Sequence, residues 1–321
     1  MKRLIIGGCM AAACCWVQVV AAQAYPSKPV RFIVPWSAGS GTDLMARAFA
    51  QELSGALGQQ IVVDNRGGAG AIIGTEAAAR SAPDGYTIYI GGSVSMAISP
   101  ALYAKVGYDP VKDFAPVSLV SRFFNALSVH PSVPARSVKE FVALARARPG
   151  ELLMGSAGNG STSHLSGELF KQMAKVNLLH VPYKSGGQLV VGVLSGESHL
   201  SFSPVSTSLT HMKTGKLRTL GVSSTKRLAA LPDLPAIAET VPGYEFGGWQ
   251  AIFAPAGAPQ DIVARLHGAI LKASSAQGFK DYLYREGSDL VGSTPTELAT
   301  FLQADVKKNG DLIRSAGIKL Q

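Results

Sequence analysis

Cysteine is scarce in this sequence, and all of it lies at one end. The three cysteines, Cys9, Cys14 and Cys15, fall within the first 15 residues of 321. The rest of the chain has no thiol that could form a disulfide or bind a metal as a thiolate. A disulfide-stabilised fold is therefore excluded for that part. A chain of this length buries enough apolar surface for two ordinary domains without such bridges.

Catalytic motifs are missing as well. No G-x-S-x-G nucleophile elbow occurs, and the six histidines show neither H-E-x-x-H nor another metal-like pairing. Carboxylates are sparse in the expected loops, and no close pair is suited to acid–base catalysis. The sequence therefore predicts no enzyme, no metal site and no cofactor. For His164, a packing role and a contact with an anion both stay open.

The first 24 residues have the pattern of an export signal. Lys2 and Arg3 precede an apolar stretch that ends in the A-x-A cleavage pattern at 22–24. We expect a cleaved signal peptide at 1–24 and a periplasmic mature protein of 297 residues with its formal charge lowered from +9 to +7. A permanent anchor would lack stop-transfer charges, and a lipoprotein would lack the aliphatic residue expected before its cysteine. The positive charge favours anionic small molecules or a membrane surface over nucleic acid.

Two glycine- and serine-rich loops follow apolar runs. The first, at 35–43, leads into a helical pattern, and Ser40 and Asp43 have the spacing of a capping box. The second, at 155–165, has the same character. Helix starts offer N–H groups without intrahelical partners, so each loop is suited to bind an anion. A third small-residue turn, at 91–95, follows the expected strand at 86–90, where open α/β sheets place their ligands.

Strand and helix patterns alternate in both halves of the chain, which predicts an α/β fold of parallel βαβ units. The extended runs at 114–129 and 249–253 are expected to cross between two lobes. The last two helices, which begin near 260 and 295, have no neighbouring strand and are expected to pack back on the first domain. We therefore expect a discontinuous domain 1 at 25–124 and 250–321, a domain 2 at 125–249, and a hinge between them.

The glycine run at 67–74 allows a rival interpretation, a dinucleotide site. It follows an expected strand and precedes a helix, but its spacing is G-x-G-x-x-x-G, and the strand at 87–90 carries no acidic residue for a ribose. The alternative is a tight structural turn.

Several short motifs together resemble one family, the periplasmic solute-binding receptors of the tripartite tricarboxylate transporters, often called Bug-type receptors. The resemblance covers essentially the whole mature length, and it rests on YPSKPV at 25–30, VPWSAGSGTD at 34–43, VDNRGGAG at 63–70, PDGYT at 83–87, GSAGNGSTSHL at 155–165, VPYK at 181–184, KTGKLR at 213–218 and FAPAGAP at 253–259. It implies a two-lobed, type II Venus-flytrap fold that closes on a carboxylate. It also implies ligand contacts at Trp36, Ser37, Ala38, Ser40, Thr42, Ser93, Ser95, Ser156, Ala157, Asn159, Ser161 and Thr162.

Ser203 is also an expected ligand contact, and here the sequence departs from many of these relatives, which often carry an aspartate that could pair with a ligand ammonium. We therefore expect a ligand without a free amine, either a dicarboxylate or an aromatic carboxylate. The expected protein is a monomer that delivers this ligand to membrane permease subunits. Presentation of the ligand to a periplasmic sensor-kinase domain is the alternative.

Overall fold

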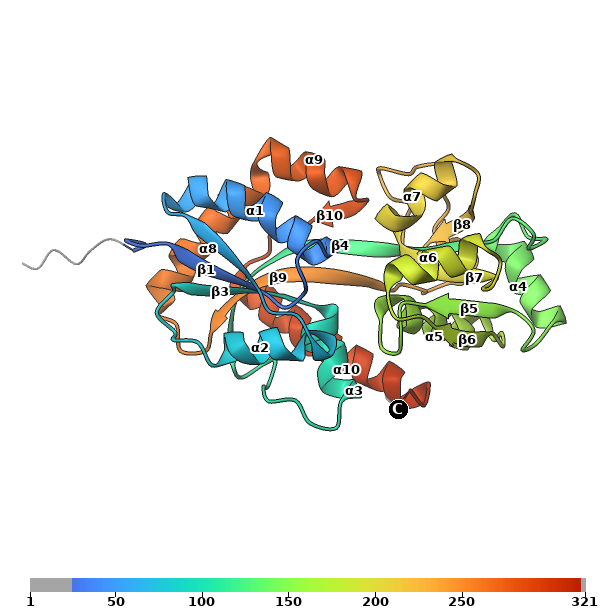
Figure 1. Cartoon of the computed structure of the whole chain (residues 1–321), viewed down its shortest axis with the longest axis horizontal. Helices are drawn as coiled ribbons and strands as arrows, with labels where there is room; N and C mark the ends of the chain where they lie inside the picture. Colours follow the sequence, from blue (N-terminus) through green and yellow to red (C-terminus); the bar gives the residue numbers. More distant parts are fainter. Residues whose placement is uncertain (1–24, 319–321) are drawn as a thin grey trace, which may run out of the picture.

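The computed structural model describes residues 25–318 (Figure 1). The expected signal peptide at 1–24 lies outside the described residues, and so do the three cysteines. Among the helices of that described part, none has both the length and the apolar character to cross a bilayer.

The first of two lobes is built around a parallel sheet. Its strands β2 (Ile61–Asn65), β1 (Val30–Val34) and β3 (Thr87–Gly92) lie in that order, and α1 (Gly41–Leu57) and α2 (Ile72–Ala79) connect them. The prediction of parallel βαβ units is confirmed here. The lobe also contains the turn η2 (Ser93–Ile98), α3 (Ser99–Leu102), α8 (Gln260–Ser275), α9 (Gln277–Arg285) and β10 (Ser288–Leu290).

The second lobe repeats this design and lies beside the first along the long axis of the molecule (Figure 1). Its strand β5 (Leu153–Ser156) pairs in parallel with β6 (Leu179–Pro182) and β7 (Leu200–Pro204). The remaining elements are α4 (Val138–Ala147), α5 (Thr162–Ala174), α6 (Gly186–Leu194), α7 (Val205–Lys213), β8 (Arg218–Val222) and the short turn η3 (Ile237–Glu239).

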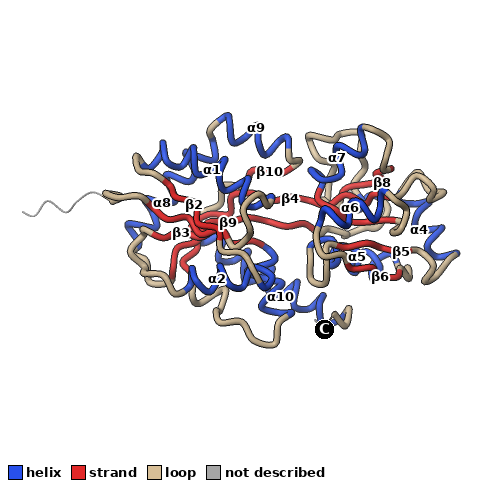
Figure 2. The backbone as a smooth tube through the Cα atoms, in the orientation of Figure 1, coloured by secondary structure: helices blue, strands red, loops and turns tan. Residues whose placement is uncertain are grey.

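Two strands connect the lobes. The 16-residue strand β4 (Phe114–Val129) pairs with β9 (Gly247–Pro255) over 114–124 and with β7 and β8 over 125–129. Figure 2 shows β4 and β9 running between the two lobes. The prediction that the run at 114–129 crosses between lobes is therefore confirmed.

The last helix, α10 (Pro295–Ser315), also spans the junction. Leu298 and Leu302 pack in a core cluster of the first lobe, whereas Leu312 and Ile313 join the core of the second. The prediction that this helix packs back on the first domain is wrong for its last turns. Its 21 residues give a rod of about 30 Å, so its two ends reach different cores.

Strand β1 shows why the first lobe folds as it does. Phe32, Ile33 and Val34 are consecutive and fully buried, as expected for a parallel strand covered on both faces. Phe32 and Val34 pack with Phe49 of α1, while Ile33 packs with Tyr89 on the opposite face. The loop that follows β1 is thereby fixed at the carboxyl edge of the sheet.

Candidate functional site

A cleft of about 420 Å³ is formed by residues of both lobes. The first lobe contributes the start of α1 and the end of α9, the second contributes the starts of α6 and α7, and strand β9 contributes one residue. The cleft is lined by Trp36, Ser40, Gly41, Thr42, Met45, Phe123, Gly186, Pro204, Val205, Ser206, Thr207, Gln250, Tyr282, Leu283, Glu286 and Ser288.

Three helices begin at this cleft: α1 at Gly41, α6 at Gly186 and α7 at Val205. The first N–H groups of a helix have no intrahelical partner, and the helix dipole adds partial positive charge there. Of the described residues that line the cleft, Glu286 is the one with a charged side chain. An anion bound in this cleft would therefore be held by amides and hydroxyls at the helix starts rather than by lysine or arginine.

Ser40 and Asp43 fix the start of α1. The Ser40 hydroxyl accepts the Asp43 N–H at 3.2 Å, as the predicted capping box requires. The Asp43 carboxylate accepts the N–H of Gly39 at 2.7 Å, not that of Ser40 itself. Half of the predicted box is therefore confirmed, and the other half is displaced by one residue because the Ser40 N–H already donates to the Ser37 carbonyl at 3.2 Å.

Asp43 is buried and ionised. Its carboxylate also accepts the Arg47 guanidinium, at 3.0 Å in the closest ion-pair contact, and the Asn65 side-chain amide at 2.8 Å. Burial alone would raise its pKa, but the hydrogen bonds from Gly39, Arg47 and Asn65 hold the pKa below its ordinary value. The first loop is thus attached to α1 and β2 by a charged acceptor.

Gln250 was not among the residues that the sequence predicted for the site. Its side-chain NH₂ donates to the Thr42 hydroxyl at 3.3 Å, and its side-chain carbonyl accepts the Ser121 hydroxyl at 3.2 Å. It therefore links the crossing strands β9 and β4 to the start of α1. A single amide within an otherwise apolar extended run at 247–255 is the sequence signal that could have found it.

The predicted residues of the first loop lie at the cleft. Trp36, Ser40 and Thr42 line it, and Ser37 and Ala38 are exposed beside them.

The predicted residues of the second loop are held differently. Asn159 is exposed, while Ala157, Ser161 and Thr162 are partly buried, and none of these four lines the cleft. A Cβ on Gly160 would lie 2.2 Å from the Leu102 side chain, so this loop packs directly against α3 of the first lobe. The ligand contacts assigned to this loop stay a prediction.

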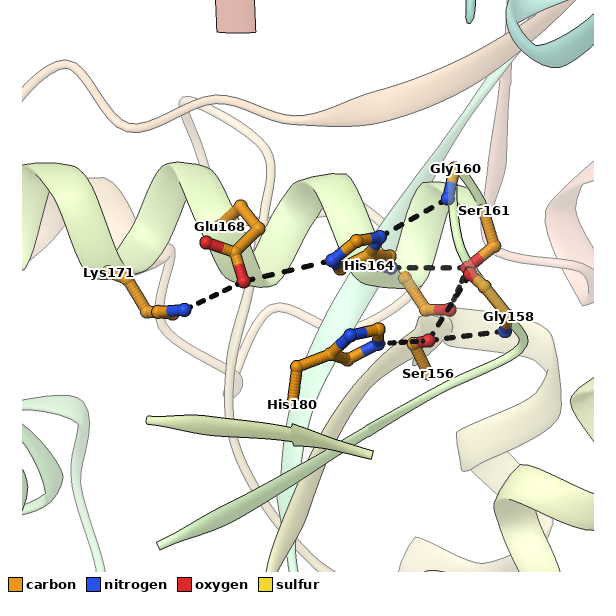
Figure 3. Close-up of polar contacts among 9 residues, drawn as sticks. Ser156, Gly158, Gly160, Ser161, His164, Glu168, Lys171 and His180 are labelled. Carbon is orange, nitrogen blue, oxygen red and sulfur yellow. Dashed lines mark hydrogen bonds and ion pairs between the residues drawn. The ribbon is translucent and has the colours of Figure 1, made fainter. Parts of the chain in front are cut away.

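Four further predicted serines are buried: Ser93, Ser95, Ser156 and Ser203. The Ser95 hydroxyl accepts the Gly92 N–H at 3.0 Å, and the Ser203 hydroxyl shares a 3.0 Å hydrogen bond with Ser201. Ser156 bonds within its own loop and to a histidine (Figure 3). The hydroxyls of Ser95, Ser156 and Ser203 thus bond within the protein, and a direct contact with a ligand stays a prediction for each of the four serines.

Of the two roles considered for His164, packing and contact with an anion, its burial and stacking support packing. It is buried on α5, its ring stacks on His180, and its Nδ1 accepts the Gly160 N–H at 3.2 Å (Figure 3).

The glycine run at 67–74 also has a structural explanation. A Cβ at Gly67 would lie 2.9 Å from the Ser37 nitrogen, and one at Gly74 would lie 2.5 Å from the Arg66 carbonyl oxygen. These contacts support the tight-turn interpretation.

The fold and the cleft define the class of protein: a two-lobed α/β periplasmic solute-binding protein. The family model described as the tripartite tricarboxylate transporter family receptor matches residues 45–318, and the chain belongs to this family.

Individual relatives support this assignment. Protein BugT of Bordetella pertussis is 33% identical over 304 residues, covering 94% of this chain and 93% of BugT. The structure of R. palustris Rpa4515 with adipate is 36% identical, has a TM-score of 0.81, and covers 92% of this chain and 99% of that one. The structure of MatC from Rhodopseudomonas palustris with bound malate is 28% identical, has a TM-score of 0.77, and covers 90% of this chain and 100% of that one.

Proposed function

We propose that this receptor captures a small carboxylate without a free amine between its lobes and delivers it to a membrane transporter. The observation that carries the proposal is the cleft at which α1, α6 and α7 begin, because helix starts bind anions without a cationic side chain. Closure of the lobes would exclude water and strengthen the charge-assisted hydrogen bonds to the ligand.

The chemistry of the ligand is supported by two observations. Adipate and malate, present in the structures of Rpa4515 and MatC, are dicarboxylates and carry no amine. Ser203, at the position where many relatives carry an aspartate, is a buried hydroxyl bonded to Ser201 and cannot supply the negative charge that would pair with a ligand ammonium. A dicarboxylate or an aromatic carboxylate fits both observations.

The setting of this activity is part of the proposal. Residues 1–24 direct export of the chain and are then cleaved. The mature protein acts in the periplasm as a monomer and passes its ligand to permease subunits without chemical conversion. Domain 1 comprises 25–124 and 250–321 and domain 2 comprises 125–249, with the end of α10 reaching across to the second lobe.

The first test is a thermal-shift screen of residues 25–321 against dicarboxylates, aromatic carboxylates, amino acids and nucleotides. A ligand at about 100 times its dissociation constant stabilises the fold by about 2.7 kcal/mol. A response to amine-free carboxylates alone supports the proposal. Tight binding of aspartate or glutamate without a response to dicarboxylates contradicts it, and Glu286 would then be the carboxylate to examine as partner of the ammonium.

Calorimetry on variants then locates the site. Gln250→Ala removes the support of Thr42, so we expect about tenfold weaker binding of the carboxylate found in the screen, the effect of one lost hydrogen bond. Gln303→Ala, on the exposed face of α10, is the matched control and should bind as the unchanged protein does. Equal affinity for both variants would place the ligand elsewhere.

Association of the liganded protein with a sensor-kinase domain rather than with permease subunits would favour the sensing alternative.

A further inference from the structure

Two histidine rings lie stacked beneath the second loop. His164 comes from the first turn of α5 and His180 from strand β6, and their ring centroids are 3.8 Å apart with an interplanar angle of 6°. Figure 3 shows the two rings side by side, each with a polar contact toward the loop. The pair therefore joins two elements of the second lobe directly below the loop at 157–161.

His164 holds one amide of this loop. Its Nδ1 accepts the Gly160 N–H at 3.2 Å, so Nδ1 carries no proton and the neutral ring has its proton on Nε2. That nitrogen faces the Glu168 carboxylate at 3.7 Å, and Glu168 in turn accepts the Lys171 ammonium at 2.8 Å. The negative charge of Glu168 stabilises this tautomer, in which Nδ1 stays an acceptor.

His180 holds a second amide through a serine. Its Nε2 lies 2.6 Å from the Ser156 hydroxyl, and that hydroxyl accepts the Gly158 N–H at 3.1 Å. The N–H groups of Gly158 and Gly160 are thus bonded to Ser156 and to His164, on the side of the loop where the two rings lie. Among the described residues, the intervening N–H of Asn159 has no hydrogen-bond partner.

The start of α5 adds further donors. Ser161 caps the helix by accepting the His164 N–H at 3.2 Å, which leaves the first two helical N–H groups, those of Thr162 and Ser163, without intrahelical partners. Because the Gly160 backbone also packs against Leu102 of the first lobe, the loop is held between the imidazole pair and that lobe.

Both rings are neutral at pH 7. Burial, together with the smaller effects of the neighbouring His180 and Lys171, lowers the pKa of His164 to about 3. Burial, followed by the charge of Lys171, lowers the pKa of His180 to about 4. A protonated His164 would lose the lone pair that binds Gly160, so neutrality is required for the observed contact.

We propose that His164 and His180 are positioning residues for ligand binding: by fixing the Gly160 and Gly158 amides, they keep the N–H groups of Asn159 and Thr162, which lie outside the lining of the 420 Å³ cleft, available to a ligand carboxylate. The histidines themselves do not touch the ligand. This proposal rests on the proposed carboxylate-binding function and adds to it the residues that preorganise the second loop.

Three variants test it in the mature protein. His164→Phe keeps a stacked ring but removes the acceptor for Gly160, and His180→Phe removes the contact with Ser156. His164→Asn replaces Nδ1 by a side-chain oxygen that is able to accept the same N–H. His211→Phe, on α7 of the same lobe, is the control for loss of a histidine as such.

Two measurements are made on each variant. Amide hydrogen exchange followed by NMR reports the loop without any ligand, and calorimetry with adipate as the probe reports binding. We expect His164→Phe to lose at least about tenfold protection at Gly160, and His180→Phe to lose it at Gly158, with adipate binding weakened about tenfold or more in both. His164→Asn and His211→Phe should retain the protection and the affinity of the unchanged protein.

The outcomes separate the two proposals. Unchanged adipate affinity in both phenylalanine variants, in a protein that binds adipate, overturns the positioning role. Equal loss of affinity in His164→Phe and His164→Asn also overturns it, because the acceptor would then be irrelevant. If the unchanged protein binds none of the carboxylates tested but His164→Phe still loses protection at Gly160, the loop contact stands and the proposed function fails.

Discussion

The two loops at the lobe junction share one local geometry but are held by opposite means. In the first, the Gly39 N–H bonds to the Asp43 side chain and Ser40 caps α1. In the second, the Gly160 N–H bonds to the His164 side chain and Ser161 caps α5. Both caps accept an N–H at 3.2 Å from the residue three positions on. The pattern Gly-Ser-x-x-acceptor therefore produces the same turn twice.

The difference lies in the surroundings of the acceptor. One helical turn after Asp43 stands Arg47, and one turn after His164 stands Glu168. The neighbouring strands add Asn65 to the first loop and the ring of His180 to the second. An anionic acceptor is stable beside a cation and an amide. A neutral imidazole is stable beside a carboxylate and another ring, so in each loop the residue one turn on matches the charge of the acceptor.

The strongest test of this comparison removes the charged acceptor. Asp43→Ala leaves the Gly39 N–H, Arg47 and the Asn65 amide without their common partner, so we expect the free energy of unfolding to fall by about 2–3 kcal/mol. Urea unfolding of the unliganded protein measures this change. Asp311→Asn is the control: this carboxylate on α10 pairs with Lys307 and Arg314, but because exposed ion pairs contribute little, the midpoint should change little. A loss as small as that of the control would mean that the charge does not stabilise the loop.

The sequence predicted most of the fold because the signals for it are local. The alternation of β-branched runs and amphipathic helices is complete within short windows, and the 114–129 crossing strand is recognisable by its lack of helical period. The path of α10 was not predictable in this way. Leu312 and Ile313 follow the same apolar stripe as Leu298 and Leu302, and a stripe does not state which core it meets.

The site was predictable to a smaller extent for a related reason. Glycine and serine identify turns and helix caps, so the sequence located both loops but not which of their hydroxyls are already bonded within the protein. Ser95 and Ser203 show this, since the Ser95 hydroxyl accepts the Tyr89 hydroxyl and the Ser203 hydroxyl bonds to Ser201, and the residue types alone do not indicate either bond. Gln250 and the His164–His180 stack unite residues distant in sequence, and no local pattern announces such contacts.

A smaller effect also distinguishes the second loop, whose acceptor is a neutral imidazole: its contribution to stability depends on pH. Both histidine pKa values are lower in the folded chain than the ordinary value near 6.5, so the unfolded chain takes up protons first as the pH falls. The pair's contribution to stability is therefore complete above pH 6.5 and is lost as the pH falls toward the folded pKa values, about 4 for His180 and about 3 for His164. Between pH 7 and pH 6, protonation of the two histidines in the unfolded chain should lower the free energy of unfolding by about 1 kcal/mol.

Urea unfolding at several pH values measures this slope. The double variant His164→Asn/His180→Asn should show a flatter dependence, while Asp43 contributes only at more acidic pH because its pKa is lowered from an already acidic value. Glu168 and Lys171 are the charged groups around the pair, and both remain in the double variant. An identical slope in the two proteins would show that the rings are not buried as neutral bases.

The smallest expected effect compares the two caps themselves. Ser40→Ala and Ser161→Ala each remove one side-chain acceptor for a helix N–H, so each should lower the free energy of unfolding by about 0.5–1 kcal/mol. Ser161→Ala should cost more, because its hydroxyl also donates to the Gly158 carbonyl at 2.7 Å and bonds to Ser163, whereas Ser40 lies beside the cleft. Thermal unfolding of the two single variants against Ser275→Ala, at the exposed end of α8, measures the difference. A larger loss for Ser40→Ala would contradict the conclusion that the second loop is the more internally bonded of the two.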